Sequence, residues 1–133
     1  MAKNGDIVRG IYDALGKGDV PAVLGVFDPD IRWTEAENFI YAEGNPYVGP
    51  QAVAQGVFQR VVSEVEGFTV TPEQFVEGDD TVVVQGRYRG IMKATRKRID
   101  AQFAHVWQLR GGKVVRFQQY TDTKQWAHAA GRE

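Results

Sequence analysis

The sequence contains no cysteine, which excludes disulfide bonds, thiolate nucleophiles and zinc sites with sulfur ligands. Serine occurs once, at Ser63, without the G-x-S-x-G setting of a serine hydrolase. The two histidines, His105 and His128, lack the H-E-x-x-H spacing of a metal site. No P-loop or G-x-G-x-x-G motif is present. We therefore expect a protein that uses neither a metal ion nor a cofactor.

Long apolar runs are also missing, since none approaches the roughly 18 residues that cross a membrane. The stretch MAKNGDIVRG lacks the apolar core of a signal peptide, so we expect a cytoplasmic protein. The 16 basic and 17 acidic residues give a net charge of −1. Nucleic acid is not an expected partner, because binding phosphates requires a basic excess. With 43% hydrophobic and 25% charged residues, the chain is predicted to form one globular domain over 1–133.

The first half of the chain has helical periodicity. Apolar residues recur at the i, i+3, i+4 spacing within 7–15, and glycines follow, so we expect a helix that ends there. Asp19 is typical of the N-cap of a short second helix. Two adjacent apolar rows predict a third helix over 50–66, ended by Gly67.

The second half alternates apolar and polar residues with the period of a β-strand. The pattern covers 82–89, 99–110 and 115–121, and glycine-rich turns separate the strands. A short helix from Thr123 ends the chain. Helices followed by a meander of long strands predict an α+β fold with an antiparallel sheet covered on one face.

His105 lies in the middle of a predicted strand, on its apolar side, between Phe103 and Trp107. It is either a core histidine satisfied by a backbone group or a tyrosine hydroxyl, or a functional residue of a pocket. Gln119 falls on the inward side of the next strand. Two polar groups on one inner face favour a cavity over a sealed core.

Carboxylates offer the remaining chemistry. If IRWTEAE begins as a strand, Trp33, Glu35 and Glu37 share one face, and Trp33 is expected to point inward. Burial against an indole would raise the pKa of the Glu35 carboxyl and suit it to act as a base near neutral pH. The alternative is that Glu35 is a solvated glutamate of a loop. Asp122 ends the last strand, and strict alternation turns it outward unless a bulge intervenes. It is either a cap for the tail helix or an acid/base group.

Two further stretches are predicted to lie at the surface. Residues 38–49 are expected to form a lid-like loop over the open end of a pocket, with Tyr41 or Tyr47 touching the ligand. The basic run KATRKR, residues 93–98, joins two strands and is predicted to be a solvated hairpin tip.

Three stretches carry a family resemblance: IYDALGKGDVPAVLGVFDPDIRW, YVGPQAVAQGVF and AHVWQLRGGKVVRFQQYTD. With them, residues 7–124 resemble the nuclear transport factor 2-like superfamily, and within it the SnoaL-like polyketide cyclases and ketosteroid isomerase-related proteins. The resemblance implies a cone-shaped, curved, mainly antiparallel sheet wrapped by about three helices of the N-terminal half. It also implies a homodimer through the outer face of the sheet.

The resemblance further implies roles for single residues. Glu35 is similar in position to the general base of ketosteroid isomerases, and His105 stands where those enzymes hold a protonated aspartic acid as oxyanion donor. Asp122 is similar to the Y-x-D aspartate of SnoaL-like cyclases. Tyr12 lies one place from the position of the isomerase tyrosine on the first helix.

Together, these observations favour an acid–base enzyme acting on a small apolar or aromatic compound. Glu35 would remove a proton next to a carbonyl, His105 would bind the developing enolate oxygen, and Asp122 is the alternative base. The expected ligand contacts are Tyr12, Trp33, Glu37, Tyr41, Tyr47, Tyr88, Phe103, Trp107, Phe117 and Gln119. Two alternatives stay open: a binding module with the same pocket, or a structural protein whose pocket is filled by its own side chains.

Overall fold

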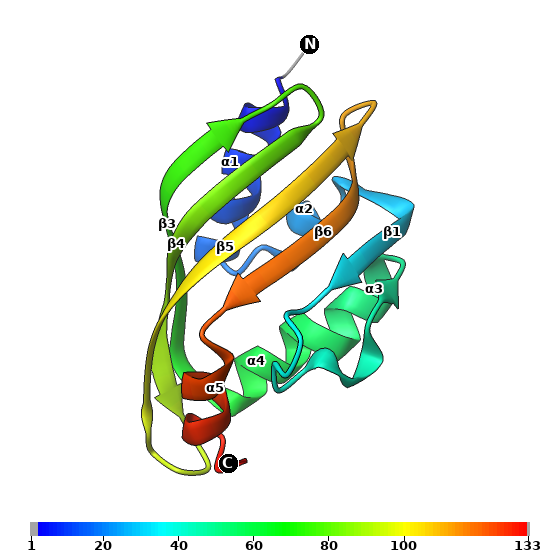
Figure 1. The fold of residues 1–133 in the computed structure, drawn as a ribbon. Helices are drawn as coiled ribbons and strands as arrows, with labels where there is room; N and C mark the ends of the chain where they lie inside the picture. Colours follow the sequence, from blue (N-terminus) through cyan, green and yellow to red (C-terminus); the bar gives the residue numbers. More distant parts are fainter. Residues whose placement is uncertain (1–2, 133) are drawn as a thin grey trace.

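The computed structural model describes residues 3–132 and begins with two helices on one side of a curved sheet (Figure 1). Helix α1 spans Asn4–Gly16, and α2 spans Val20–Leu24. The Asp19 side chain accepts a hydrogen bond from the backbone N–H of Ala22 and caps α2, as predicted. No helix within residues 3–132 is both long and apolar enough to span a membrane.

The third helical segment contains an irregular central turn. Helix α3 (Pro50–Val53), the π-helical turn η2 (Ala54–Phe58) and α4 (Gln59–Glu64) follow one another without a break. The segment ends at Glu64 and not at Gly67, because the chain is already extended at Val65. Gly67 instead lies inside a strand, where its positive φ of 62° accompanies a shift of the strand register.

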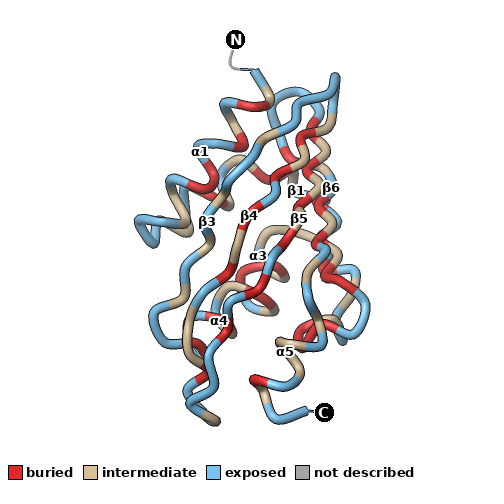
Figure 2. The backbone as a smooth tube through the Cα atoms, turned by 60° about the vertical axis from the view of Figure 1, so that its left-hand side comes forward, coloured by how far each residue is buried: buried red, intermediate tan, exposed pale blue. Residues whose placement is uncertain are grey.

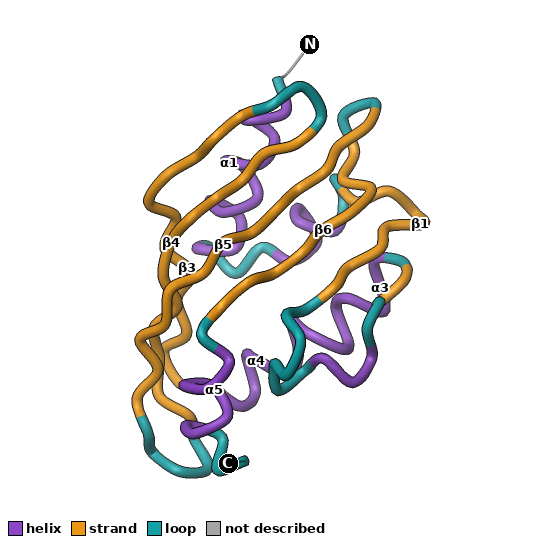
Figure 3. The backbone as a smooth tube through the Cα atoms, in the orientation of Figure 1, coloured by secondary structure: helices purple, strands orange, loops and turns teal. Residues whose placement is uncertain are grey.

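Six strands form a single open sheet in the order β2-β1-β6-β5-β4-β3. Their bounds are β1 Phe27–Thr34, β2 Tyr47–Val48, β3 Val65–Glu77, β4 Thr81–Met92, β5 Arg98–Arg110 and β6 Lys113–Thr121. All neighbours are antiparallel except β1 and β6. The three helical segments from the first half of the chain lie behind this sheet, which confirms the predicted α+β arrangement (Figure 3).

The inner face of the sheet forms the core. Along β5 the buried residues are those of the predicted apolar side, with His105 among them (Figure 2). In β6 the buried residue is Val114 rather than Val115, because the pairing with β5 shifts between Gln108 and Leu109. The shift ends before Phe117, so Phe117 and Gln119 point inward as predicted.

Tyr47 fixes the segment between β1 and the third helical segment. Its ring packs so closely on Gly44 and Gly56 that a Cβ atom on either glycine would collide with it. Its hydroxyl donates a 2.6 Å hydrogen bond to the carbonyl oxygen of Tyr41. The segment also contains the short 3₁₀ helix η1 (Ala42–Gly44). At the end of this segment, β2 pairs with β1 and forms an edge of the sheet.

Helix α5 (Thr123–Ala129) closes one end of the sheet. The Asp122 side chain accepts from the backbone N–H of Gln125 at 3.1 Å and caps the helix. The hairpin between β4 and β5 holds the other end of α5, where the Thr95 hydroxyl donates to the Ala129 carbonyl at 2.5 Å. The basic residues of this hairpin (Lys93, Arg96, Lys97 and Arg98) are exposed, as predicted.

Candidate functional site

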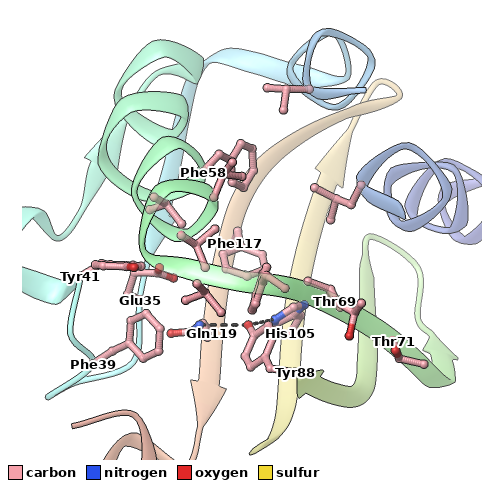
Figure 4. Close-up of a pocket in the computed structure, with 18 of the residues that line it drawn as sticks. Glu35, Phe39, Tyr41, Phe58, Thr69, Thr71, Tyr88, His105, Phe117 and Gln119 are labelled. Atoms are coloured by element: carbon pink, nitrogen blue, oxygen red, sulfur yellow. Dashed lines mark hydrogen bonds between the residues drawn. The ribbon is translucent and has the colours of Figure 1, made fainter. Parts of the chain in front are cut away.

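A cavity of about 590 Å³ lies between the inner face of the sheet and the helices (Figure 4). Its polar lining groups include the side chains of Glu35, Tyr88, His105 and Gln119. The remaining wall is mostly aromatic and aliphatic: Trp33, Phe39, Tyr41, Val57, Phe58, Val61, Val65, Phe68, Val70, Trp107, Phe117 and Trp126 are among the lining residues. Such a cavity suits a small apolar molecule with a few polar groups.

Glu35 follows directly after β1 and is only 1% exposed. The Asn45 side chain holds its backbone, accepting from the Glu35 N–H and donating to its carbonyl, both at 2.8 Å. One carboxyl oxygen, Oε2, accepts a 3.2 Å hydrogen bond from Trp33 Nε1, whereas Oε1 has no partner among residues 3–132. Burial raises the pKa of Glu35 to about 8, and the Trp33 hydrogen bond and Arg60 counteract part of this rise.

An ion pair lies close to Glu35. The Arg60 guanidinium lies 2.7 Å from Glu43 Oε1 and 4.3 Å from the centre of the Tyr41 ring. Arg60 lowers the pKa of Glu35, whereas Glu43 raises it. Burial is the largest effect on this carboxyl, so it stays largely protonated at pH 7.

Two tyrosine hydroxyls hold His105 from both sides. Tyr12 Oη lies 2.6 Å from Nδ1, and Tyr88 Oη lies 2.5 Å from Nε2. The ring stacks on Phe103 at 3.9 Å. Burial lowers the pKa of His105 to about 3, so the imidazole is neutral at pH 7. A neutral imidazole has one donor and one acceptor nitrogen, so the two tyrosines must play different roles.

The neighbouring residues determine these roles. Tyr12 Oη accepts from Trp107 Nε1 at 2.9 Å, and Nδ1 of His105 is the only acceptor within residues 3–132 for its own proton. Nε2 of His105 then carries the hydrogen and donates to Tyr88. Tyr88 Oη also accepts from Gln119 Nε2 at 3.0 Å. With two donors on its oxygen, Tyr88 has its own O–H left to donate into the cavity that it lines.

Gln119 is oriented by a backbone group. Its Oε1 accepts a 3.1 Å hydrogen bond from the N–H of Ala36, which leaves its Nε2 to donate to Tyr88. Because Ala36 follows Glu35 in the chain, this hydrogen bond also joins the segment that carries the carboxyl to β6. Gln119 thereby links Tyr88 to the backbone that follows Glu35.

Comparison with known proteins identifies the family. The family model described as a SnoaL-like domain matches residues 8–117. The chain belongs to the SnoaL-like family. No curated protein matches it.

Solved structures agree with this assignment. An NTF2-like protein from Burkholderia thailandensis is 34% identical to this SnoaL-like chain, with 98% of both chains covered and a TM-score of 0.93. An NTF2-like protein of unknown function from Burkholderia pseudomallei is 28% identical, with 97% of this chain and 98% of that chain covered and a TM-score of 0.87. TerC, co-crystallised with polyporic acid, shares the fold at 23% identity, with 95% and 96% covered and a TM-score of 0.83. The predicted superfamily and fold class are confirmed.

The cavity of the SnoaL-like chain brings together most of the residues singled out from the sequence. Glu35 and His105 both line it. Of the expected ligand contacts, six also line it: Trp33, Tyr41, Tyr88, Trp107, Phe117 and Gln119. The alternation of β4, β5 and β6 identified Tyr88, His105, Trp107, Phe117 and Gln119. The inward position of Trp33 identified Glu35, and Tyr41 came from the loop predicted over 38–49.

Five expected site residues do not line this cavity. Glu37 is exposed, because β1 ends at Thr34 and its alternation does not continue to residue 37. Asp122 faces outward and caps α5. Tyr12 and Phe103 lie behind His105, on its Nδ1 and its ring face. The Tyr47 ring packs against Gly44 and Gly56 instead.

The sequence did not point to several aromatic residues of the wall. Phe39 follows the end of β1, Phe58 belongs to the π-helical turn, and Phe68 lies in β3. Trp126, from α5, is 1% exposed and packs against Phe39 and Tyr88 with ring centres 4.9 and 5.6 Å apart. The one signal for Trp126 was a large aromatic residue in an otherwise polar tail.

Within residues 3–132, no three histidine, aspartate or glutamate side chains are grouped as ligands for a metal ion. The cavity instead offers Oε1 of Glu35, which has no partner among residues 3–132, for proton transfer, and the O–H of Tyr88 for polarising a ligand oxygen.

Proposed function

We propose that this SnoaL-like protein is a cofactor-independent acid–base enzyme acting on an apolar cyclic carbonyl compound. Glu35 removes a proton from the carbon next to the carbonyl group. Tyr88, supported by His105 and Gln119, donates a hydrogen bond to the oxygen on which negative charge develops. The product is an isomerised enone or an aldol-cyclised compound.

The position of Glu35 carries this proposal. Burying the Glu35 carboxyl in an apolar cavity destabilises the folded protein, because the carboxyl loses its water and one of its oxygens gains no hydrogen bond in return. Its raised pKa of about 8 makes the carboxylate a stronger base than an exposed glutamate. Oε1 has no hydrogen-bond partner among residues 3–132 and is free to contact a ligand.

The hydrogen-bond network of Tyr88 supports the second role. Burial raises the pKa of Tyr88 well above its usual range, so the phenol keeps its proton and can donate it. The neutral His105 does not contact the ligand oxygen in this mechanism, because tyrosines occupy both of its nitrogens. It acts as a positioning residue, which changes the direct role expected from the sequence. Fixed donors of this kind stabilise developing charge without reorganisation.

The aromatic wall supports a flat, cyclic substrate. Trp33 and Phe117 stack with ring centres 3.7 Å apart, and Trp107 packs on both. These rings leave a cavity rather than filling it, which does not favour the purely structural role. The binding of polyporic acid by TerC is consistent with a small organic ligand in this fold.

The proposal is tested by solvent deuterium exchange into 1-tetralone, other polycyclic ketones and cyclic enones. We expect catalysed exchange at the carbon next to the carbonyl, with a rate that rises with pH and levels off above about 8. The reason is that the carboxylate is the basic form, and at pH 7 only about a tenth of Glu35 carries it. Ligands that raise the melting temperature without exchange would support a binding module instead.

Replacing Tyr88 by phenylalanine is expected to slow exchange by about 10²-fold, because it removes the donor to the developing oxyanion. The matched variant Tyr12→Phe removes a hydroxyl from the same network on the far side of His105, and we expect a decrease of only about tenfold or less. Both rates would be measured at one pD with variants of confirmed fold. Equal losses in the two variants would contradict a direct role for Tyr88.

A further inference from the structure

Two buried side-chain polar atoms lack a hydrogen-bond partner within residues 3–132, and the proposed reaction uses only one of them. The first is Oε1 of Glu35, and the second is Nε1 of Trp126. The other two tryptophans both have partners, because Trp33 donates to Glu35 and Trp107 donates to Tyr12. Trp126 therefore differs from them in holding a buried donor that no residue of the described range 3–132 satisfies.

Trp126 lines the cavity. Its ring is 1% exposed and lies among Phe39, Phe68 and Tyr88, which also line the cavity. An indole N–H is a donor only, so a carbonyl, ether or hydroxyl oxygen is the group that would satisfy it. An unsatisfied buried donor is costly, and a ligand oxygen removes that cost.

Helix α5 holds Trp126 firmly in this position. Asp122 caps its start, and Thr95 binds the carbonyl of Ala129 near its end. Beyond the helix, the Arg132 guanidinium donates to the carbonyl of Ile40 at 2.9 Å. The indole therefore comes from a fixed helix, whereas Tyr88 and its supporting residues come from the sheet. The two donors belong to different walls of the cavity.

We infer that Trp126 Nε1 binds a second oxygen of the ligand, so that the substrate is a cyclic compound with at least two oxygen functions. One oxygen is the reacting carbonyl at Tyr88, and the other is an acceptor that meets Trp126 at the α5 wall. This inference rests on the proposed function for the first oxygen. Trp126 is then a residue that determines specificity and takes no part in proton transfer.

The test compares 1-tetralone derivatives that carry a methoxy group at carbon 5, 6 or 7 with the matching ethyl derivatives. Methoxy and ethyl groups have the same number of heavy atoms, but only methoxy is an acceptor. We expect at least one methoxy isomer to bind about tenfold more tightly than its ethyl counterpart. In Trp126→Phe, which keeps an aromatic ring without the N–H, this preference should fall to less than about twofold.

A second measurement follows the indole N–H signals of the ¹⁵N-labelled wild-type protein by NMR, and it uses a variant only to assign them. The three tryptophans give three signals, and Trp126→Phe identifies one of them. The preferred methoxy compound should move the Trp126 signal downfield, whereas its ethyl counterpart should not. The inference is overturned if no methoxy compound binds more tightly than its ethyl counterpart, and also if none of these compounds binds. An unmoved Trp126 signal overturns it too, and indicates that the N–H points at a neighbouring ring.

The same compounds separate this inference from the proposed function, because tetralones also have exchangeable protons. If the protein prefers the methoxy compound in a way that depends on Trp126 but catalyses no deuterium exchange, the enzyme proposal is wrong and the second oxygen site is supported. Exchange with a Trp126 signal that no compound moves would lead to the opposite conclusions.

Discussion

The Glu35→Gln variant is expected to lose nearly all exchange activity, with a rate constant at least about 10³-fold below that of the wild type. Glutamine keeps the shape of the side chain and an oxygen for Trp33 Nε1, but its amide cannot take up the proton. Ligand affinity should change by much less than the rate. The measurement is deuterium incorporation at pD 8, with ligand binding followed by thermal shift on the same samples.

A matched control is available at Asp122, the other carboxylate singled out from the sequence. Asn is as good an N-cap as Asp, so Asp122→Asn should leave α5 intact. Because Asp122 faces away from the cavity, exchange should stay within about twofold of the wild type. If activity is lost in Asp122→Asn and kept in Glu35→Gln, the base lies on the outer face and our assignment of Glu35 is wrong.

The second large effect concerns stability as a function of pH. The folded protein favours protonated Glu35, so between pH 4.5 and about 8 it binds more protons than the unfolded chain. Its free energy of unfolding must therefore fall as pH rises through this window. The shift corresponds to roughly 5 kcal/mol at most. The Gln variant lacks this loss, so we expect its stability relative to wild type to grow from pH 5 to pH 9.

His105 acts in the opposite direction at lower pH. The folded state favours the neutral imidazole, so between pH 6.5 and about 3 it binds fewer protons than the unfolded chain, and stability falls as pH drops. The difference between wild type and Glu35→Gln cancels this contribution, because both contain His105. Urea unfolding at each pH gives that difference directly.

The Trp33 indole signal offers an independent check on this titration. Trp33 Nε1 donates to Glu35 Oε2, so its N–H shift should change with a midpoint near pH 8 in wild type and stay flat in Glu35→Gln. A midpoint near 4.5 would show an ordinary carboxyl and undermine both the stability prediction and the proposed base.

Much of the candidate site could be predicted from the sequence because β5 is regular. Strict alternation from Ile99 to Leu109 predicted that His105 lies on the inner face, and the resemblance to a known family predicted the sheet around it. Glu35 was found for a similar reason, since Trp33 lies on the inward side of β1. Regular strands transmit side-chain direction over many residues, and that direction can be read from the sequence.

The rest depended on contacts between elements far apart in the chain. Nothing in the pattern shows that Tyr12 and Tyr88 meet at His105, because 76 positions separate helix α1 from that point of β4. The prediction for Glu37 extended an alternation beyond Thr34, where β1 ends. The position of Trp126 in the cavity could not be predicted from the sequence, since it depends on the packing of α5 against the hairpin between β4 and β5.

The close packing of Tyr47 on Gly44 and Gly56 has a consequence for how this sequence tolerates change. Asn45, which holds the backbone of Glu35, lies between Gly44 and Tyr47 in the chain. A side chain at either glycine would collide with the Tyr47 ring, and we expect the displacement of this ring to disturb Asn45 as well. The carboxyl therefore depends on two residues that never touch it. Under the proposed function, random mutagenesis should therefore find inactivating substitutions at Gly44 and Gly56, which lie beyond the lining of the cavity.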